Sequence, residues 1–187
     1  FEEARAATAA LLAGEVSAAQ AGAFLVALRI KGEGPAELAG VAQALRDRAA
    51  VLRRDGETPL VCSVGAFDGF ADAPPLGLAA SLCAAAAGAA VGSACGPRLG
   101  PKHGVTVAEV LEALGGPGRP APAESEAMLA RCGVAVVHAG AALPGWEAVA
   151  ELREEIGLRG PLHSAEKLVD WFGARRFVVG HTHSGYG

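Results

Sequence analysis

The chain has 187 residues and a formal charge of −4 at pH 7, which is room for one ordinary domain with a small helical appendage. Its content of 51% hydrophobic and 19% charged residues excludes a disordered chain. The acidic balance argues against a generally basic nucleic-acid binder. Aromatic residues make up only 5%, so we expect close approach of small residues to build the core, with helices packed on a sheet.

The cysteine pattern predicts a reducing compartment. Cys62, Cys83, Cys95 and Cys132 lack the spacing of a zinc or redox motif, and we interpret them as small buried apolar residues in a cytoplasmic protein. The uncharged stretch 73–97 is rich in alanine and is interrupted by proline and glycine. It therefore favours a buried helix followed by a buried strand over a membrane span.

The first 56 residues predict a helical domain. Glycines and capping residues separate three helices, at Phe1–Ala13, Ala18–Lys31 and residues 35–54. The third helix carries the only obvious basic cluster, which we interpret as a solvated helix face. This cluster consists of Arg46, Arg48, Arg53 and Arg54.

Residues 57–187 predict an α/β domain, because short apolar runs alternate with helical segments, which indicates a mainly parallel sheet covered on both faces. The abrupt ends of the chain lead us to expect part of a longer polypeptide, incomplete at the C-terminal end of this domain. The predicted strands are Leu60–Val64, Ala89–Gly92, Val134–His138 and Arg175–His181. The predicted helices are Leu76–Ala87, Val105–Leu114, Glu124–Arg131, Gly145–Ile156 and Ser164–Phe172.

The loop after the first predicted strand is a candidate ligand site, because ligands collect at the carboxyl ends of parallel strands. It contains Gly65, Asp68 and Gly69. Glycines let a backbone approach an anion, and a carboxylate in such a loop can hold a ribose hydroxyl or a metal. The alternative is a plain Asp-Gly turn.

The loop after the second predicted strand is a second candidate. Gly96, Arg98, Lys102 and His103 place a glycine turn beside cations at the entry of a predicted helix, an arrangement that suits an anion. A solvated loop with scattered charges is the alternative, and the sequence leaves both open.

A third group lies further along the chain. Arg159 can bind a carboxylate or phosphate through two hydrogen bonds, although an ordinary surface arginine is the alternative. His163 and Lys167 are four residues apart and share one side of a turn, and Ser164 is the expected helix cap.

The last predicted strand carries two histidines on one face, His181 and His183. Since neither a cysteine nor a carboxylate accompanies them locally, a metal site is not expected there.

Four segments, in matching order along nearly the whole chain, resemble anthranilate phosphoribosyltransferases (glycosyltransferase family 3). They are residues 13–33, 84–88, 107–115 and 173–180. The resemblance implies a small helical domain followed by an α/β domain of the nucleoside phosphorylase/phosphoribosyltransferase type. It also implies a homodimer formed through the helices.

The family's functional motifs match only in part. Its G-T-G-G-D pyrophosphate loop falls on residues 65–68, with Phe67 where phosphate would approach. Its N-x-S-T falls on residues 75–78, and its K-H-G-N-R falls on residues 94–98. The resemblance implies Mg²⁺, with Asp68 on ribose hydroxyls or the metal and Arg159 on an aromatic acid.

A divergent branch of this family, of doubtful activity in tryptophan synthesis, fits better. Its pattern resembles Phe67-Asp68-Gly69, Arg159 followed by residues 163–168, and the terminal residues 182–186. One type within this branch binds nucleic acid without sequence preference.

Two functions follow from the resemblance. The first is pentosyl transfer from phosphoribosyl pyrophosphate to an unknown acceptor such as an aromatic acid, with an eroded pyrophosphate loop. The second is a non-catalytic homologue that binds nucleic acid or another polyanion. We favour the first, because neither half of the chain is basic. It requires two glycine turns, residues 65–69 and 96–104, to meet above the sheet around an electropositive pocket.

Overall fold

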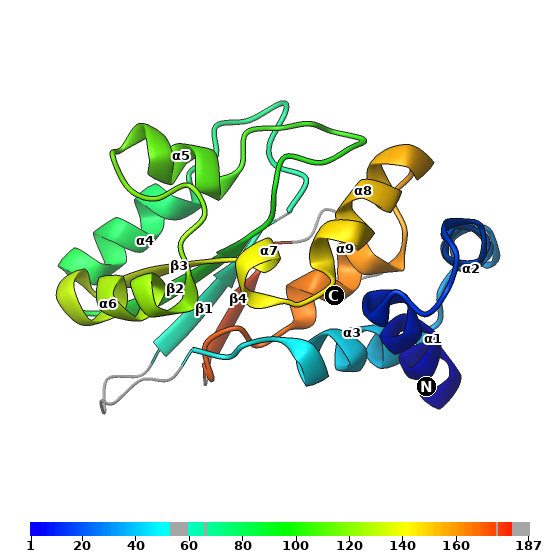
Figure 1. Ribbon diagram of the computed structural model, residues 1–187. Helices are drawn as coiled ribbons and strands as arrows, with labels where there is room; N and C mark the ends of the chain where they lie inside the picture. Colours follow the sequence, from blue (N-terminus) through cyan, green and yellow to red (C-terminus); the bar gives the residue numbers. More distant parts are fainter. Residues whose placement is uncertain (53–59, 66, 175, 181–187) are drawn as a thin grey trace.

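A computed structural model describes residues 1–52, 60–65, 67–174 and 176–180. Within these ranges the chain forms a four-stranded, all-parallel sheet in the order β3-β2-β1-β4 (Figure 1). This confirms the predicted parallel sheet. The strands are β1 (Leu60–Val64), β2 (Ala90–Cys95), β3 (Val134–His138) and β4 (Arg176–Val179). Because β2 continues to Cys95, the second glycine turn starts directly at its carboxyl end.

Helices cover both faces of the sheet, and each face has its own hydrophobic core. Along β3 the side chains alternate between these cores: Ala135 and Val137 belong to one core, and Val134 and Val136 belong to the other. One face carries α4 (Gly77–Ala86), α5 (Val107–Ala113) and α6 (Pro122–Cys132). The other carries α7 (Ala139–Ala142), α8 (Trp146–Ile156), α9 (Pro161–Ala165) and the 3₁₀ helix η1 (Glu166–Leu168).

The N-terminal helices share one hydrophobic core with α8 and α9, the core on the face of the sheet that carries these two helices. A left-handed Gly14 ends the first helix, and Ser17 and Gln20 form a capping box at the start of the second. The predicted boundary at residues 56 and 57 falls outside the described ranges and stays a prediction. The helices are α1 (Glu2–Ala13), α2 (Ala18–Lys31) and α3 (Pro35–Arg48).

Two of the expected helices are wrong in extent. The third helix ends at Arg48, six residues early, because Ala50 donates its backbone N–H to Ala142 across the core. The last expected helix, 164–172, is replaced by α9 and η1, so Ser164 lies inside a helix and caps nothing. Beyond η1 the Asp170 carboxylate accepts two backbone N–H groups and turns the chain.

The core contains more aromatic packing than the composition predicts. Trp146, Trp171 and Phe67 are the largest fully buried side chains in the described ranges. The Phe67 ring centroid lies 6.3 Å from that of Trp146 and 6.2 Å from that of Trp171. Three of the few aromatic residues are therefore packed together, with Phe67 coming from the first glycine turn.

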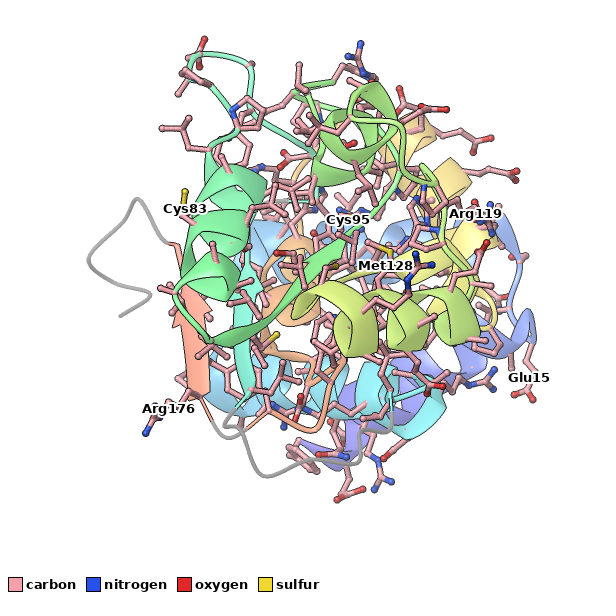
Figure 2. The ribbon with its side chains drawn as sticks, turned by 90° about the vertical axis from the view of Figure 1, so that its left-hand side faces the viewer. Glu15, Cys83, Cys95, Arg119, Met128 and Arg176 are labelled. Atoms are coloured by element: carbon pink, nitrogen blue, oxygen red, sulfur yellow. The ribbon has the colours of Figure 1, made fainter. Side chains whose placement is uncertain are left out.

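The cysteine interpretation is correct for two residues only. Cys62 and Cys95 are buried, and burial raises the pKa of each thiol to about 12. Cys83 and Cys132 are exposed, and Figure 2 shows Cys83 on the outer side of α4. The expectation of a fully buried helix in 73–97 is also wrong, because α4 forms an outer layer and presents one side to solvent. No helix in the described ranges could span a membrane.

Candidate functional site

The two predicted glycine turns meet at the carboxyl ends of β1 and β2. Gly104 donates its N–H to the backbone carbonyl of Asp68 at 3.0 Å. Phe70 and Val105 exchange a pair of backbone hydrogen bonds, each 3.0 Å long, in an isolated antiparallel bridge. The juxtaposition that the proposed ligand site requires is therefore present.

Glycine is needed at this crossing for steric reasons. Gly69 has φ +79°, and a Cβ there would lie 2.3 Å from the carbonyl oxygen of Gly104. A Cβ on Gly104 would lie 2.4 Å from the backbone nitrogen of Phe70. The Asp68-Gly69 turn thus brings two backbones closer than any other residue allows. Gly65 stands half-buried just after β1, against the Phe70 ring.

Phe67 occupies the space that we expected a ligand to use. Its side chain is 1% exposed, and a Cβ on Gly96 would stand 3.1 Å from its ring. The expected pocket between the first turn and Gly96 is therefore filled by an aromatic side chain. The physical reason is that the Phe67 ring packs against the buried rings of Trp146 and Trp171.

Asp68 and Arg159, predicted as separate ligand contacts, bind each other. Arg159 Nε donates to Asp68 Oδ2 at 2.8 Å, and Nη2 donates to Oδ1 at 2.6 Å. The carboxylate side chain is 1% exposed, whereas the guanidinium side chain is 36% exposed. Such a two-bond pair is the strongest form of carboxylate recognition by arginine, and it joins the first turn to the segment between α8 and α9.

A second ion pair lies deeper in the same region. Arg153 Nη1 donates to Glu166 Oε2 at 2.7 Å, and both side chains are almost completely buried. The Arg153 guanidinium also stands 5.1 Å from the centroid of the Trp146 ring. Within the part of the chain that the structure describes, its Nε and Nη2 have no hydrogen-bond partner. Desolvation raises the pKa of Glu166, and the neighbouring Arg153 opposes this shift.

The sequence interpretation did not include Arg153 or Glu166. The signal for Arg153 was its spacing, three and four residues after the buried Ala150 and Val149 on α8. Glu166 gave no comparable signal, because its burial depends on the short α9 and the 3₁₀ turn that follows it.

His163 lies between the two ion pairs. Its Nδ1 accepts the N–H of Gly160 at 3.1 Å, and its Nε2 lies 3.5 Å from the carbonyl oxygen of Gly100. Burial, reinforced by the nearby charge of Arg153, lowers the pKa of His163 to about 3. His163 is therefore a neutral side chain that links α9 to the second glycine turn.

Glu154 of α8, absent from our predicted site, fastens the second turn. Its carboxylate accepts the Gly100 N–H at 2.7 Å and lies 3.1 Å from His103 Nε2. His103 adopts φ +48°, an uncommon conformation outside glycine. The contact holds the exposed imidazole of His103 against Glu154 of α8.

Two lysines bring further positive charge to this region. Lys167 is half-buried, and its pKa is lowered first by burial and then by the positive charge of Arg159. Lys102 adds to this repulsion, while Asp68 counteracts it. Lys102 and Arg159 are thus both within electrostatic range of Lys167, and we call these three residues the cation cluster.

Arg98 points to a different place. It forms an exposed ion pair with Glu109, 3.0 Å between Nη2 and Oε1, and lines an open groove of about 330 Å³ together with Arg119. Arg119 fastens the far side of this groove, since it donates to the Gly140 carbonyl at 2.6 Å and pairs with Glu147 at 2.7 Å. Figure 2 shows Arg119 far from Cys83 across the molecule.

Several sequence predictions concern residues without a described placement. His181, His183 and the terminal 182–186 motif lie outside the described ranges, as do Arg53 and Arg54. Of the remaining basic cluster, Arg46 Nε donates to the Leu168 carbonyl at 3.0 Å. That arginine joins α3 to η1, so the cluster is in part a packing contact between helices.

The described residues do not fit a magnesium ion. They contain no group of three or more His, Cys, Asp or Glu side chains that could hold a metal. Asp68, the carboxylate assigned to this role by resemblance, has both oxygens engaged by Arg159. Mg²⁺ takes carboxylate oxygens in nearly ideal octahedral geometry, which this pair does not offer.

Comparisons with known proteins agree with the fold and the order of these elements. Residues 1–49 match the model of the helical bundle domain of a glycosyl transferase family. The chain is 36% identical over 141 residues to an anthranilate phosphoribosyltransferase of Halobacterium salinarum, covering 75% of this chain and 41% of the relative. It is 34% identical over 179 residues to that of Thermus thermophilus, covering 96% and 54%.

Solved structures give the same result. The crystal structure of the Thermus thermophilus enzyme superposes with a TM-score of 0.84 at 33% identity, over 99% of this chain and 55% of that one. The Saccharomyces cerevisiae enzyme in complex with PRPP and Mg has a TM-score of 0.74 at 14% identity, over 90% and 47%, and shows the fold alone. The chain spans about half the length of these relatives. It is a member of the anthranilate phosphoribosyltransferase-like family.

Proposed function

We propose that this protein is a phosphoribosyltransferase that binds phosphoribosyl pyrophosphate on the solvent side of the crossing of the two glycine turns, outside the space that Phe67 fills, and transfers its pentosyl group to an aromatic acid. The observation that carries the proposal is the position of Arg159, which binds Asp68 of the first turn at 2.8 and 2.6 Å beside a glycine-only crossing at the carboxyl ends of β1 and β2. Lys167 of the cation cluster is within electrostatic range of Arg159. Ligands of parallel α/β sheets bind at this edge. Family membership supports the same reaction class.

The chemistry needs fixed positive charge. When pyrophosphate leaves, negative charge develops on its oxygens while the anomeric carbon becomes positive. Preorganised donors aimed at the developing charge stabilise such a transition state. We assign this role to Lys102 and Lys167, with Gly69 and Gly104 allowing close approach of the backbone. The pyrophosphate loop is altered in this proposal, because Phe67 stands where the family has a small residue.

An aromatic acid is our proposed acceptor class, since the relatives are named anthranilate phosphoribosyltransferases. A narrow pocket of about 20 Å³ beside Arg159 supports this assignment. Its apolar walls come from Leu25, Ile156 and Leu162, and the pocket is also lined by three arginines, Arg29, Arg153 and Arg159. Among the described residues, Arg153 Nε and Nη2 have no hydrogen-bond partner. Apolar walls with a few convergent charges suit an apolar carboxylate. The pocket has room for about one water, so a ring has to widen it.

Calorimetric titration with phosphoribosyl pyrophosphate tests the donor site. We expect saturable binding that Lys167→Ala weakens about tenfold, which corresponds to one charge-assisted contact. Lys31→Ala is the matched control, because Lys31 pairs with Glu37 on the exposed surface of the N-terminal helices. If both variants bound phosphoribosyl pyrophosphate with the affinity of the wild type, the cation cluster would not be part of the donor site. Titrations with and without Mg²⁺ determine whether the ion arrives with the ligand.

The nucleic-acid alternative predicts a different pattern. Salt-sensitive retention of a random oligonucleotide, together with no binding of phosphoribosyl pyrophosphate, would replace our proposal with that function. Competition between anthranilate and aniline for the donor-loaded protein tests the acceptor class, because only the former carries the carboxylate that we assign to the arginine pocket.

We also propose a homodimer formed through the N-terminal helices. Ile30, near the end of α2, is 81% exposed, and a large apolar side chain in water favours an interface with a second copy. Sedimentation equilibrium is expected to give a dimer that Ile30→Glu dissociates. Leu114→Glu is the control, since Leu114 is also exposed but lies on the other side of the sheet, after α5. A monomeric wild-type protein contradicts this proposal.

A further inference from the structure

We infer that the Asp68 carboxylate occupies the place on Arg159 that an anionic ligand would take. A doubly charged oxyanion such as a phosphate must therefore displace this carboxylate in order to bind Arg159. This inference rests on the proposed function only in giving Arg159 a ligand. The inference reverses the effect on ligand binding that we expected of Asp68: the carboxylate competes with the substrate instead of holding it.

The geometry of the pair resembles ligand recognition. Two nitrogens of one guanidinium edge meet the two oxygens of one carboxylate, at 2.8 and 2.6 Å. A phosphate or a carboxylic acid presents the same pair of oxygens to arginine. An incoming anion therefore needs no new arrangement of Arg159, only the place that Asp68 now occupies.

The exposure of the two partners differs in a way that permits exchange. The Asp68 side chain is 1% exposed, whereas the Arg159 side chain is 36% exposed. An anion can thus approach Arg159 from solvent on the guanidinium side. The neighbouring Arg153–Glu166 pair has 2% and 1% exposure, so the bond between these two side chains is closed to solvent and is not a candidate for exchange.

Further polar side chains lie within electrostatic range of the Asp68 carboxylate. Its charge acts on both Lys167 and His163, raising the pKa of each against the effect of burial. In the exchange that we infer, the Asp68 side chain moves away from Arg159, while the Asp68 backbone carbonyl keeps its hydrogen bond from Gly104.

The exchange makes the site selective for ligand charge. Displacement of a carboxylate costs a strong charge-assisted pair, so a singly charged ligand gains little by replacing it. A doubly charged oxyanion interacts with Arg159 and also with Lys102 and Lys167. While Asp68 is bound to Arg159, the anion cannot bind there. The apparent affinity for the anion therefore equals the intrinsic affinity multiplied by the fraction of molecules in which Arg159 is free.

Inorganic pyrophosphate is the probe for this inference, titrated calorimetrically at about 0.15 M ionic strength, where long-range charge effects beyond about 8 Å are screened. We expect Asp68→Asn to bind pyrophosphate about tenfold more tightly than the wild type, since loss of the pair frees Arg159. Glu155→Gln on the exposed side of α8 removes the same charge and is expected to change affinity less than twofold. Unchanged or weaker binding by Asp68→Asn, or equal tightening by both variants, overturns the inference.

A second measurement on the wild-type protein avoids any loss of folding in the variant. The Arg159 Nε–H resonance, assigned in ¹⁵N-arginine spectra by its absence in Arg159→Lys, is expected to shift when pyrophosphate binds. Pyrophosphate binding without that shift overturns the inference. If pyrophosphate behaves as expected but phosphoribosyl pyrophosphate does not bind, the proposed function fails while the competition by Asp68 stands.

Discussion

Two arginine–carboxylate pairs, one on α8 and one on the segment that follows it, differ in burial. In Arg153–Glu166 both side chains are buried, with 2% and 1% exposure. In Arg159–Asp68 only the carboxylate is buried. The two pairs therefore have different roles: the first joins α8 to η1, whereas the second leaves a cation within reach of solvent.

The physical reason lies in desolvation. In a buried pair, the attraction between the two charges offsets the cost of dehydrating them only while both side chains remain in contact. Such a pair can therefore neither separate nor take another partner. A half-exposed guanidinium keeps part of its hydration and can change partners at lower cost. The exposed Arg98–Glu109 pair, at 51% and 38%, is the third member of this series. Four predictions test the ranking.

The largest effect is expected from Glu166→Ala. It leaves Arg153 charged and without its partner in a dry interior, and we expect a loss of about 3–5 kcal/mol in the free energy of unfolding, measured by urea denaturation. The double variant Arg153→Met, Glu166→Leu is the control, because replacing both charges with apolar groups removes the penalty. A loss below about 1 kcal/mol in the single variant would contradict the ranking.

The next effect concerns pH and the histidine between the pairs. Burial lowers the pKa of His163 to about 3, while in the unfolded chain it is near 6.5. The stabilising contribution is therefore complete above pH 6.5 and is lost as pH falls toward 3, with a slope of up to about 1.4 kcal/mol per pH unit. We expect His163→Asn to flatten the stability profile by this amount between pH 6 and 4. An unchanged slope places the proton elsewhere, for example on His138, whose pKa burial lowers to about 4.

Asp68→Ala is expected to cost less, about 1–2 kcal/mol, because the released guanidinium can turn to water. Thermal unfolding at pH 7 measures it. The comparison with Glu166→Ala is direct, since both variants delete one buried carboxylate that faces an arginine. Equal costs would show that exposure of the arginine does not matter here.

The smallest effect is expected from Arg98→Ala, less than about 0.5 kcal/mol in the free energy of unfolding, as is usual for exposed ion pairs. Its pair with Glu109 is open to solvent on both sides. Urea denaturation in low and high salt checks this. A larger loss would mean that Arg98 holds the second glycine turn in place, as the sequence interpretation grouped it.

Much of the fold follows from the sequence because hydrophobic periodicity and capping residues act over a few neighbours. The boundaries of β1 and β3, and the capping box at Ser17, are as predicted. The last predicted helix failed because Trp171 and Phe172 are apolar for a tertiary reason: they fill the core below the first turn. Local spacing alone does not distinguish such residues from a helix face.

The candidate site was predictable to the level of residue types and their approximate edge of the sheet. Glycines and cations after parallel strands identified the crossing and the cation cluster. Which charge faces which could not be read from the sequence, because Asp68 and Arg159 are 91 residues apart and meet only through the packing of α8 on the sheet.

The sequence by itself determined the parallel α/β architecture, the helical N-terminal region and the place of the glycine turns, since each depends on short-range pattern. Only the tertiary structure decided that Phe67 fills the space at Gly96 and that Asp68 occupies Arg159. Both outcomes come from close packing: a buried ring and a buried carboxylate take the nearest complementary partner, and long-range contacts determine which partner that is.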